Sequence, residues 1–322
     1  MDLAIRVKHP GGAEQLEAAQ CPPQSPGKGG IRLRHEAIGV NFLDIYHRKG
    51  LYPLPAPGIP GVEGVGRIEA LGEGVEGLEP GQRVAYAGLA GGYATTRLLP
   101  AWRAIPLPEA ADSTVVAGSL LRGLTAHMLL TRSYPVGAGT TVLVHAAAGG
   151  LGTIVTRWAA HLGACVIGTV GSPDKAALAM DCGAQHVLVG RDVDYAAQIA
   201  ALTKGRGVDF AIDGIGGATL AQTLACVRRF GTVASIGEAG GPIPPLAVEA
   251  IGPVRALNFA RPSVIAYTTE RDTYPAAVKA VLAIMDEGIA APLCGSYPLA
   301  HAAQAHRDLE SGETAGAIVL VP

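Results

Sequence analysis

Residues 141–152 read TVLVHAAAGGLG, and this stretch decides the fold of the chain. Its first half, Thr141–Ala146, is short, β-branched and apolar, as expected of a buried strand. The chain then passes directly into a helical pattern over residues 150–162. Between the two, Ala147, Gly149 and Gly152 occupy the three positions of the G-x-G-x-x-G dinucleotide fingerprint. The stretch therefore predicts a strand–turn–helix unit that binds a dinucleotide.

The small residues of this turn have separate physical roles. Ala147 is small enough for the tight turn, Gly149 lets the backbone approach a pyrophosphate, and Gly152 lets the helix pack closely on the strand. The free N–H groups at the start of the helix then face the phosphates. A second strand at residues 165–170 follows at the expected distance, which completes the βαβ pattern.

The rest of the chain has two parts that differ in their predicted secondary structure. The first 120 residues or so are β-rich and irregular, with strands predicted at 3–7, 30–38, 64–71 and 82–87. From Thr141 onward, strands and helices alternate, which predicts right-handed crossovers and a parallel sheet. Strands are predicted at 141–146, 164–170, 186–189, 208–213, 231–237 and 256–261, and helices at 150–162, 173–181, 194–203 and 217–227. Since six strands complete this sheet, the tail, with helices at 273–286 and 299–309 and a strand at 317–321, is expected to return to the first part.

Composition limits the classes of function. The chain has 322 residues, of which 49% are hydrophobic and 16% charged, and its net charge is −2. The high hydrophobic fraction predicts a large core. The net charge near zero argues against a basic surface that would bind nucleic acid or an anionic membrane. No apolar run reaches the length of about 18 residues that spans a bilayer, and the N-terminus lacks an apolar signal region, so a cytoplasmic protein is expected. The five cysteines are scattered without a C-x-x-C motif, which favours reduced and mostly buried thiols.

The end of the second predicted strand bears on the choice of cofactor. NAD enzymes place an acid there to bind the ribose 2′-hydroxyl, whereas this chain reads GTVGSPDK over residues 168–175, with no acid at the tip. Ser172 and Lys175 can bind a 2′-phosphate, so NADPH is favoured over NADH. In the alternative interpretation, Ser172 caps a helix that starts at Pro173, and Lys175 is solvated.

The order of a β-rich part, a dinucleotide-binding part and a returning tail resembles the medium-chain dehydrogenase/reductase superfamily. Its zinc alcohol dehydrogenases carry a Gly-His-Glu motif with cysteine ligands on either side. The matching residues here are Gly61-Val62-Glu63, residues 40–44 contain no cysteine, and the four-cysteine run of the structural zinc site is missing. Because zinc needs three or four N, S or O ligands, no metal site is predicted.

Within this superfamily the chain resembles the zinc-free, zeta-crystallin-like quinone oxidoreductases over nearly its whole length. The matching segments are GVNFLDIY (39–46), GLYP (50–53), GLTA (123–126), HAAAGGLG (145–152), RPS (261–263) and YTT (267–269). The resemblance implies an α/β protein with a GroES-like β-rich catalytic domain at 1–121 and 264–322. A Rossmann domain with a doubly wound, six-stranded parallel sheet would occupy 122–263.

The resemblance also implies a set of site residues. Asn41, Tyr46 and Tyr52 are the expected catalytic residues. The residues expected to bind NADPH are Asn41, Phe42, Tyr46, Thr125, Gly149, Gly150, Leu151, Gly152, Gly171, Ser172, Lys175, Gly237, Pro262 and Ser263. This chain departs from its relatives at Gly190, Gly312 and Glu238, where they have Tyr, Arg and Asn, and the first two departures weaken the expected 2′-phosphate site.

Several of these polar residues also have a structural interpretation. Asn41 can cap a turn, and Asp44 can be the N-cap of a short helix. Tyr46 and Tyr52 can be packing residues with wet hydroxyls. Without zinc, Glu63 is expected to be an ion-pair partner. His145 is favoured to be a hydrogen-bonded structural histidine. A salt bridge explains Arg261 as well as a contact with the cofactor does.

The implied reaction is hydride transfer from the nicotinamide to a quinone in the interdomain cleft. A quinone is electrophilic enough to need no Lewis acid, and Tyr46, Tyr52 or water can supply the proton. An NADPH-dependent enone or alkenal reductase is the nearest alternative, and a weakly catalytic redox sensor is a further one. A homodimer is implied by the resemblance, with residues 243–257 and the following edge strand as a candidate interface, although the prolines there can also blunt that edge.

Overall fold

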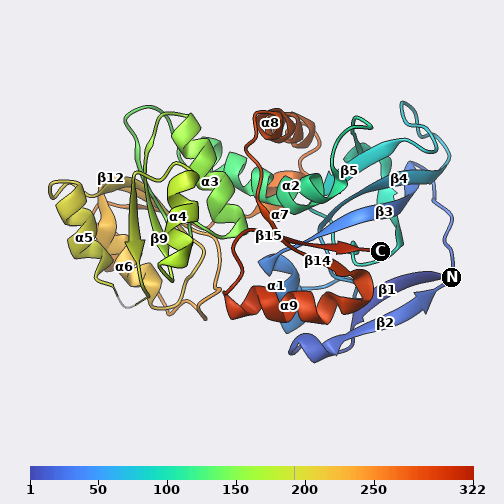
Figure 1. Cartoon of the computed structure of the whole chain (residues 1–322), viewed down its shortest axis with the longest axis horizontal. Coiled ribbons are helices and arrows are strands. Elements are labelled where there is room, and N and C mark those ends of the chain that lie inside the picture. Colours follow the sequence, from blue (N-terminus) through green and yellow to red (C-terminus); the bar gives the residue numbers. More distant parts are fainter. Residues whose placement is uncertain (192) are drawn as a thin grey trace. The chain divides into compact units, whose positions relative to one another are not determined.

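The computed structural model describes residues 1–191 and 193–322, and the chain divides into two compact units (Figure 1). The first unit comprises Met1–Leu124, Ile265–Ala283 and Ala290–Pro322, and the second comprises Thr125–Val264 and Ile284–Ile289. Among the helices that the structure describes, none is both long enough and apolar enough to cross a membrane.

The second unit is built on a six-stranded sheet whose paired strands are all parallel. Its strands are β8 (Thr141–Val144), β9 (Cys165–Val170), β10 (His186–Val189), β11 (Val208–Asp213), β12 (Val227–Ser235) and β13 (Asn258–Ala260). Its helices are α3 (Gly150–His161), α4 (Asp174–Asp181), α5 (Tyr195–Leu202) and α6 (Thr219–Cys226), with a π-helical segment, η3 (Leu129–Ser133), and a 3-10 turn, η4 (Val248–Ala250). The strand order β10-β9-β8-β11-β12-β13 confirms the predicted doubly wound fold.

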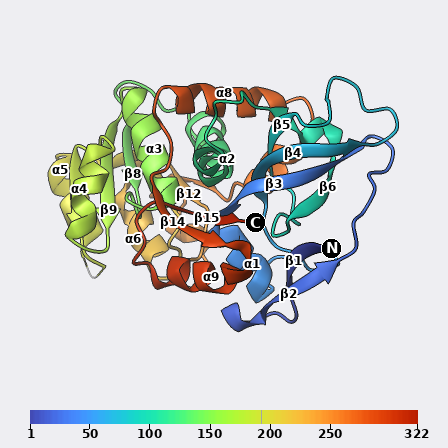
Figure 2. The same cartoon turned by 45° about the vertical axis from the view of Figure 1, so that its right-hand side comes forward.

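Burial of the strands explains why the sequence was enough to predict this sheet. All six residues of β11, VDFAID, are buried, and so are Val142, Leu143 and Val144 of β8. Helix α3 packs on β8 and β9 (Figure 2), and α6 packs on β11 and β12. A parallel sheet covered by helices in this way needs near-continuous apolar runs, and such runs are what the sequence contains.

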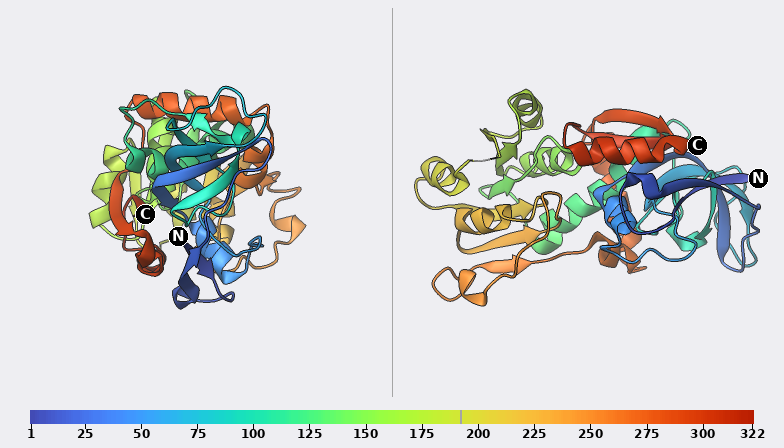
Figure 3. Two further views of the ribbon diagram at one scale, coloured as in Figure 1. Left: turned by 90° about the vertical axis from the view of Figure 1, so that its right-hand side faces the viewer. Right: turned by 90° about the horizontal axis from the view of Figure 1, so that it is seen from below.

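The first unit contains a seven-stranded sheet of order β14-β15-β3-β4-β5-β7, with β6 paired to β3, and a separate β1–β2 hairpin. Its strands are β1 (Asp2–Val7), β2 (Leu16–Cys21), β3 (Gly30–Val40), β4 (Glu63–Leu71), β5 (Arg83–Ala87), β6 (Thr96–Pro100), β7 (Ile105–Pro106), β14 (Leu293–Pro298) and β15 (Ala317–Val321). As expected, the tail returns to it, because β15 pairs with β3 and α9 (Ala302–Ser311) packs against β14 and β15 (Figure 3). Its remaining helices are α1 (Phe42–Lys49), α7 (Val264–Thr269), α8 (Tyr274–Asp286) and the 3-10 turns η1 (Ala13–Gln15), η2 (Ala101–Arg103) and η5 (Leu299–His301).

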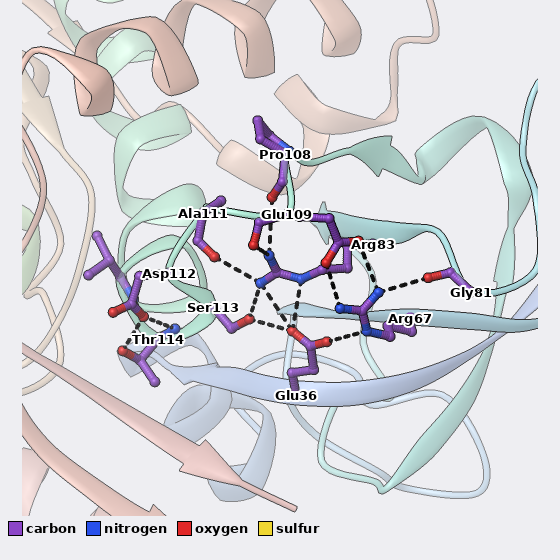
Figure 4. A network of polar contacts seen from close by, with 11 residues as sticks. Glu36, Arg67, Gly81, Arg83, Pro108, Glu109, Ala111, Asp112, Ser113 and Thr114 are labelled. Carbon is purple, nitrogen blue, oxygen red and sulfur yellow. Dashed lines mark hydrogen bonds and ion pairs between the residues drawn. The ribbon is translucent and has the colours of Figure 1, made fainter.

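One buried arginine holds the chain where it leaves the small strand β7 and enters α2 (Ser113–Met128) (Figure 4). Arg83 is 5% exposed, and its guanidinium pairs with the Glu36 carboxylate at 3.1 Å. It also donates to the carbonyls of Pro108, Glu109 and Ala111 and to the hydroxyl of Ser113. These bonds satisfy carbonyls of a turn that has no strand partner of its own.

Some sequence expectations need correction. The strand expected at 231–237 begins four residues earlier, as β12, because α6 runs straight into it at Val227 without a turn residue. The strands β2, β6, β7 and β14 and the helices α2 and α7 were not predicted. The cysteines are all free, as expected, but only Cys182 and Cys226 are buried, and Cys294 is exposed.

Candidate active site and cofactor-binding loop

The loop between β8 and α3 takes the shape that the glycine fingerprint predicts. Gly149 is the N-cap of α3, and its N–H donates to the Ala146 carbonyl at 2.8 Å. Ala146 itself has a left-handed backbone, with a φ of 50°. The turn is tied to the next strand by a 2.9 Å bond from the Ala147 N–H to the Thr169 carbonyl.

Gly152 is required by contact with this loop. A Cβ at Gly152 would lie 2.1 Å from the Ala146 carbonyl oxygen and 2.8 Å from the Ala147 Cα, and both are backbone atoms. A Cβ at Gly149 would lie 3.2 Å from the same oxygen, which is tight but less severe. The third glycine of the fingerprint therefore allows α3 to start directly against the end of β8.

The first turn of α3 has the properties of an anion site. The opening N–H groups of an α-helix have no partner within the helix, and they carry the positive end of its dipole. No acidic side chain stands in this first turn. Gly149, Gly150, Leu151 and Gly152 thus fit a pyrophosphate in both shape and charge.

The tip of β9 has no carboxylate, in agreement with the sequence. Gly171 is exposed and Ser172 is partly buried. The N-cap of α4 is Pro173, whose φ of −57° and ψ of −38° are helical, so helical backbone begins directly after Ser172. Lys175 lies in the first turn of α4, where its N–H donates to the Ser172 carbonyl at 3.2 Å.

A cation from the next loop reaches this tip, and the sequence reasoning missed it. A Cβ built on Gly171 would lie 3.4 Å from the Nε of Arg191 and 4.0 Å from its Nη2. The guanidinium of Arg191 thus lies over the backbone of Gly171. The position of Arg191 in the sequence could have indicated this contact, because Arg191 follows the third strand along the chain and therefore emerges at the same carboxyl edge of the sheet as Gly171.

The remaining predicted cofactor contacts of this unit follow the carboxyl ends of β12 and β13. Gly237 comes two residues after β12 and is buried, while Pro262 and Ser263 come directly after β13 and its flanking Arg261. Arg261 forms a 2.7 Å ion pair with Glu238 and donates to the Ser235 hydroxyl. The salt-bridge interpretation of Arg261 is therefore the one that the structure supports.

His145 is a structural residue of the sheet edge. One ring nitrogen contacts the Thr169 hydroxyl at 3.0 Å and the other contacts the Thr223 hydroxyl at 2.9 Å. Thr223 in turn donates to Asp213, whose other oxygen accepts the N–H groups of Ile215 and Gly216. Burial lowers the pKa of His145, so its ring is neutral and both nitrogens are occupied.

In the first unit, Asn41 begins the helix α1. It is the N-cap, and its N–H donates to the Asp44 carboxylate at 2.8 Å. The capping interpretation of Asn41 is thus correct, and Asp44 is the third residue of the helix instead of its N-cap. The Asn41 side-chain amide also donates to Glu63 at 2.7 Å. Two carboxylates therefore fix the position of Asn41.

Glu63 is the ion-pair partner that the sequence suggested. Its carboxylate is fully buried, lies 3.6 Å from the Arg122 guanidinium and accepts the Leu121 N–H. Burial raises the pKa of Glu63, although Arg122 and the hydrogen bonds oppose the rise. Arg122 itself could not be identified from sequence as the partner, because no local pattern links it to Glu63.

A second buried carboxylate, that of Asp44, belongs to the first turn of α1. Asp44 accepts bonds from the Gly61 N–H at 3.1 Å and the Tyr93 hydroxyl at 3.2 Å. Its burial raises the pKa to about 7, against the effect of these hydrogen bonds. Tyr93 also contacts His306 of α9, so the network joins α1 to the returning tail.

Three aromatic residues that were predicted as site residues lie together on and just after α1. The ring centroids of Phe42 and Tyr46 are 6.4 Å apart, and those of Tyr46 and Tyr52 are 5.6 Å apart in an edge-on arrangement. Tyr46 is 8% exposed and Tyr52 is 40% exposed. Gly50, with a φ of 76°, ends the helix and turns the chain back so that Tyr52 meets Tyr46.

The residues at the position of the dehydrogenase zinc do not fit a metal. Val62 is fully buried and offers no donor atom, and Glu63 is committed to Arg122 and Asn41. In the described ranges, no three His, Cys, Asp or Glu side chains gather as metal ligands. No zinc-dependent step is therefore considered for this chain.

The predicted site residues fall into two groups. Asn41, Phe42, Tyr46 and Tyr52 belong to the first unit, and Thr125, the pyrophosphate loop and the residues after β9, β12 and β13 belong to the second. Thr125 is half-buried within α2.

Two family models match this chain. The alcohol dehydrogenase GroES-like domain matches residues 27–109, and the zinc-binding dehydrogenase domain matches residues 150–283. The first match agrees with the GroES-like domain expected from sequence. The second is described as zinc-binding, although Val62 lacks the donor that a zinc ligand needs.

Full-length relatives and a solved structure are also similar to this chain. A 2-haloacrylate reductase from a Burkholderia species is 38% identical, covering 100% of this chain and 99% of that protein. A quinone oxidoreductase from Pseudomonas aeruginosa is 37% identical over 97% of both chains. The structure of Escherichia coli quinone oxidoreductase complexed with NADPH aligns with a TM-score of 0.94 at 34% identity and covers 100% of both chains.

Proposed function

The chain belongs to the quinone oxidoreductase family of the medium-chain dehydrogenase/reductase superfamily, and from this premise we propose that it is an NADPH-dependent quinone oxidoreductase. The observation that carries the proposal is the loop after β8. Gly152 lets α3 begin against Ala146, and the first N–H groups of that helix fit a pyrophosphate. When bound, NADPH supplies the hydride that reduces the acceptor.

The residues of the chain have distinct proposed roles. Gly150, Leu151 and Gly152 hold the pyrophosphate through backbone N–H groups, and Gly149 lets the backbone approach it. Gly171, Ser172 and Lys175 hold the adenosine phosphate. Thr125, Gly237, Pro262 and Ser263 contact the nicotinamide half. These assignments are supported by the positions of the loops after β8, β9, β12 and β13, which emerge at one edge of a parallel sheet, where ligands of such sheets bind.

The first unit supplies the proposed catalytic residues. Asn41 is positioned by Asp44 and Glu63, and it contacts the cofactor together with Phe42 and Tyr46 in this proposal. Tyr46 and Tyr52 are the proposed proton donors to the reduced oxygen, with water as the other source. The exposure of Tyr52, 40%, supports a hydroxyl that substrate can reach.

Steady-state oxidation of NADPH and NADH with 1,4-benzoquinone, in the presence of a strong chelator, tests the proposal. We expect turnover that survives chelation and prefers NADPH.

Comparison with a 2-haloacrylate decides the acceptor, since one relative is named for that substrate. A higher kcat/KM on the haloacrylate would replace the quinone by an activated C=C bond. Absent turnover with tight NADPH binding would indicate a redox sensor. In the same assay, an unchanged kcat in the Tyr46→Phe/Tyr52→Phe variant would assign the proton to water.

We also propose that the enzyme works as a homodimer in the cytoplasm. The edge strand β13 has one neighbour in its sheet. Val248 and Val254 precede it in the sequence, and Phe230 of β12 donates its N–H to the Ala256 carbonyl; each of these three residues is 73% exposed. Five free cysteines agree with a reducing compartment. Sedimentation velocity at micromolar concentration should give twice the chain mass, and a monomer would reject the dimer. Cell fractionation tests the location.

A further inference from the structure

The loop that leaves β10 presents an arginine to the tip of β9. The Nε of Arg191 would be 3.4 Å from a Cβ at Gly171, an ordinary contact distance, so the guanidinium lies against Gly171. Gly171 follows the last residue of β9 directly. In a doubly wound sheet this is the position at which the adenosine ribose is recognised.

The start of this loop is held in place by backbone bonds. The Gly190 N–H donates to the Val170 carbonyl at 2.9 Å, which extends the parallel pairing of β10 with β9 by one residue. On its other side, the Gly190 carbonyl accepts the Tyr195 hydroxyl at 2.9 Å. Gly190 adopts a φ of 120°, a conformation that side chains rarely allow, and the turn it makes leads into Arg191.

Among the described residues beside Gly171, two cations, Arg191 and Lys175, stand against one carboxylate, Asp174 in the first turn of α4. Arg191 is exposed, and Lys175 stands in the first turn of α4. Among the described residues, the ion pairs of the second unit join His161 to Glu287, Arg206 and Arg228 to Asp209, and Arg261 to Glu238. Arg191 is in none of these pairs. Asp194, three residues after it, is used as the cap of α5, where it accepts the Ala197 N–H.

We propose that Arg191 is the residue that selects the 2′-phosphorylated cofactor, by placing its guanidinium across Gly171 where the ribose 2′-phosphate binds. The inference rests on the proposed use of NADPH and adds the residue responsible for it. A planar guanidinium with several donors binds phosphate in two-point geometry, which an ammonium cannot do. The guanidinium lies within contact distance of Gly171, directly after the end of β9.

The test uses fragments as well as the whole cofactor. Calorimetric titration with adenosine 2′,5′-bisphosphate and with 5′-AMP measures the 2′-phosphate contact without any turnover. In Arg191→Ala, we expect the bisphosphate to bind roughly 10- to 100-fold more weakly, the range for a lost charge-assisted hydrogen bond, while 5′-AMP is unaffected. The ratio of kcat/KM for NADPH over NADH should fall by a similar factor. Arg191→Lys should fall between wild type and Arg191→Ala.

Arg229→Ala is the matched control, since it removes an exposed arginine near the amino end of β12, at the opposite edge of the same sheet. It should leave the cofactor ratio unchanged. If wild type prefers the bisphosphate and Arg191→Ala keeps that preference, the inference on Arg191 fails while the proposed function stands. If wild type itself shows no preference for the 2′-phosphate and does not oxidise NADPH, the proposed function fails with it.

Discussion

Gly152→Ala is expected to reduce kcat/KM for NADPH at least about 100-fold and to weaken NADPH binding to a similar extent. The new methyl carbon would lie 2.1 Å from the Ala146 carbonyl oxygen and 2.8 Å from the Ala147 Cα, and both of these atoms belong to the backbone. No side chain can move aside, so the start of α3 must shift away from the loop after β8. A displacement of about 1 Å at a binding site can cost about 100-fold in rate, and overpacking typically costs about 1–3 kcal/mol of stability.

Fluorescence titration with NADPH, urea unfolding and the quinone assay together measure this effect. Gly137→Ala is the control, because it adds the same methyl group in the same unit where no heavy atom lies within 4 Å. It should bind NADPH like wild type and change the free energy of unfolding by less than about 0.5 kcal/mol. Wild-type NADPH affinity in Gly152→Ala would show that the loop does not carry the pyrophosphate.

Arg122→Met is expected to destabilise the protein by about 3–5 kcal/mol at pH 8, because it leaves the Glu63 carboxylate buried without a cation. Arg122 is 7% exposed, and it also donates to the carbonyls of Val40 and Gly118. The loss should be smaller at pH 5. Burial already raises the pKa of Glu63 in the native protein, and removal of Arg122 raises it further. The native variant therefore binds a proton that the unfolded chain does not, so its stability falls as pH rises.

Urea unfolding at the two pH values checks this prediction, with two further variants as references. Arg122→Met/Glu63→Gln should regain much of the lost stability, since the amide removes the buried charge. Arg67→Met should cost no more than about 1 kcal/mol, because Arg67 is 45% exposed and pairs with Glu36 and Glu109 at the surface (Figure 4). Equal losses in Arg122→Met at both pH values would mean that Glu63 stays ionised without its partner.

The sequence predicted the bounds of a strand or helix correctly where the residues of that segment alone show its hydrophobic pattern. The strands β10, β11 and β15 occur with the predicted bounds, and α3 ends within one residue of its prediction. By contrast, β2 reads LEAAQC and β14 reads LCGSYP, with no β-branched residue in either. Pairing with β1 and β15 makes these segments strands, and that pairing is a property of the folded sheet.

The sequence by itself determined the dinucleotide fold, the alternation of its strands and helices along the chain, and the glycine loop after β8, because these depend on apolar runs and small residues that are neighbours in the chain. The tertiary structure decided which charges meet. Glu63 pairs with Arg122, 59 positions away, Arg48 pairs with Glu310, and Asp44 reaches His306 through Tyr93. Such partners carry no local pattern, since a side chain can pair with any opposite charge that the fold brings within about 4 Å, and only the completed packing selects one.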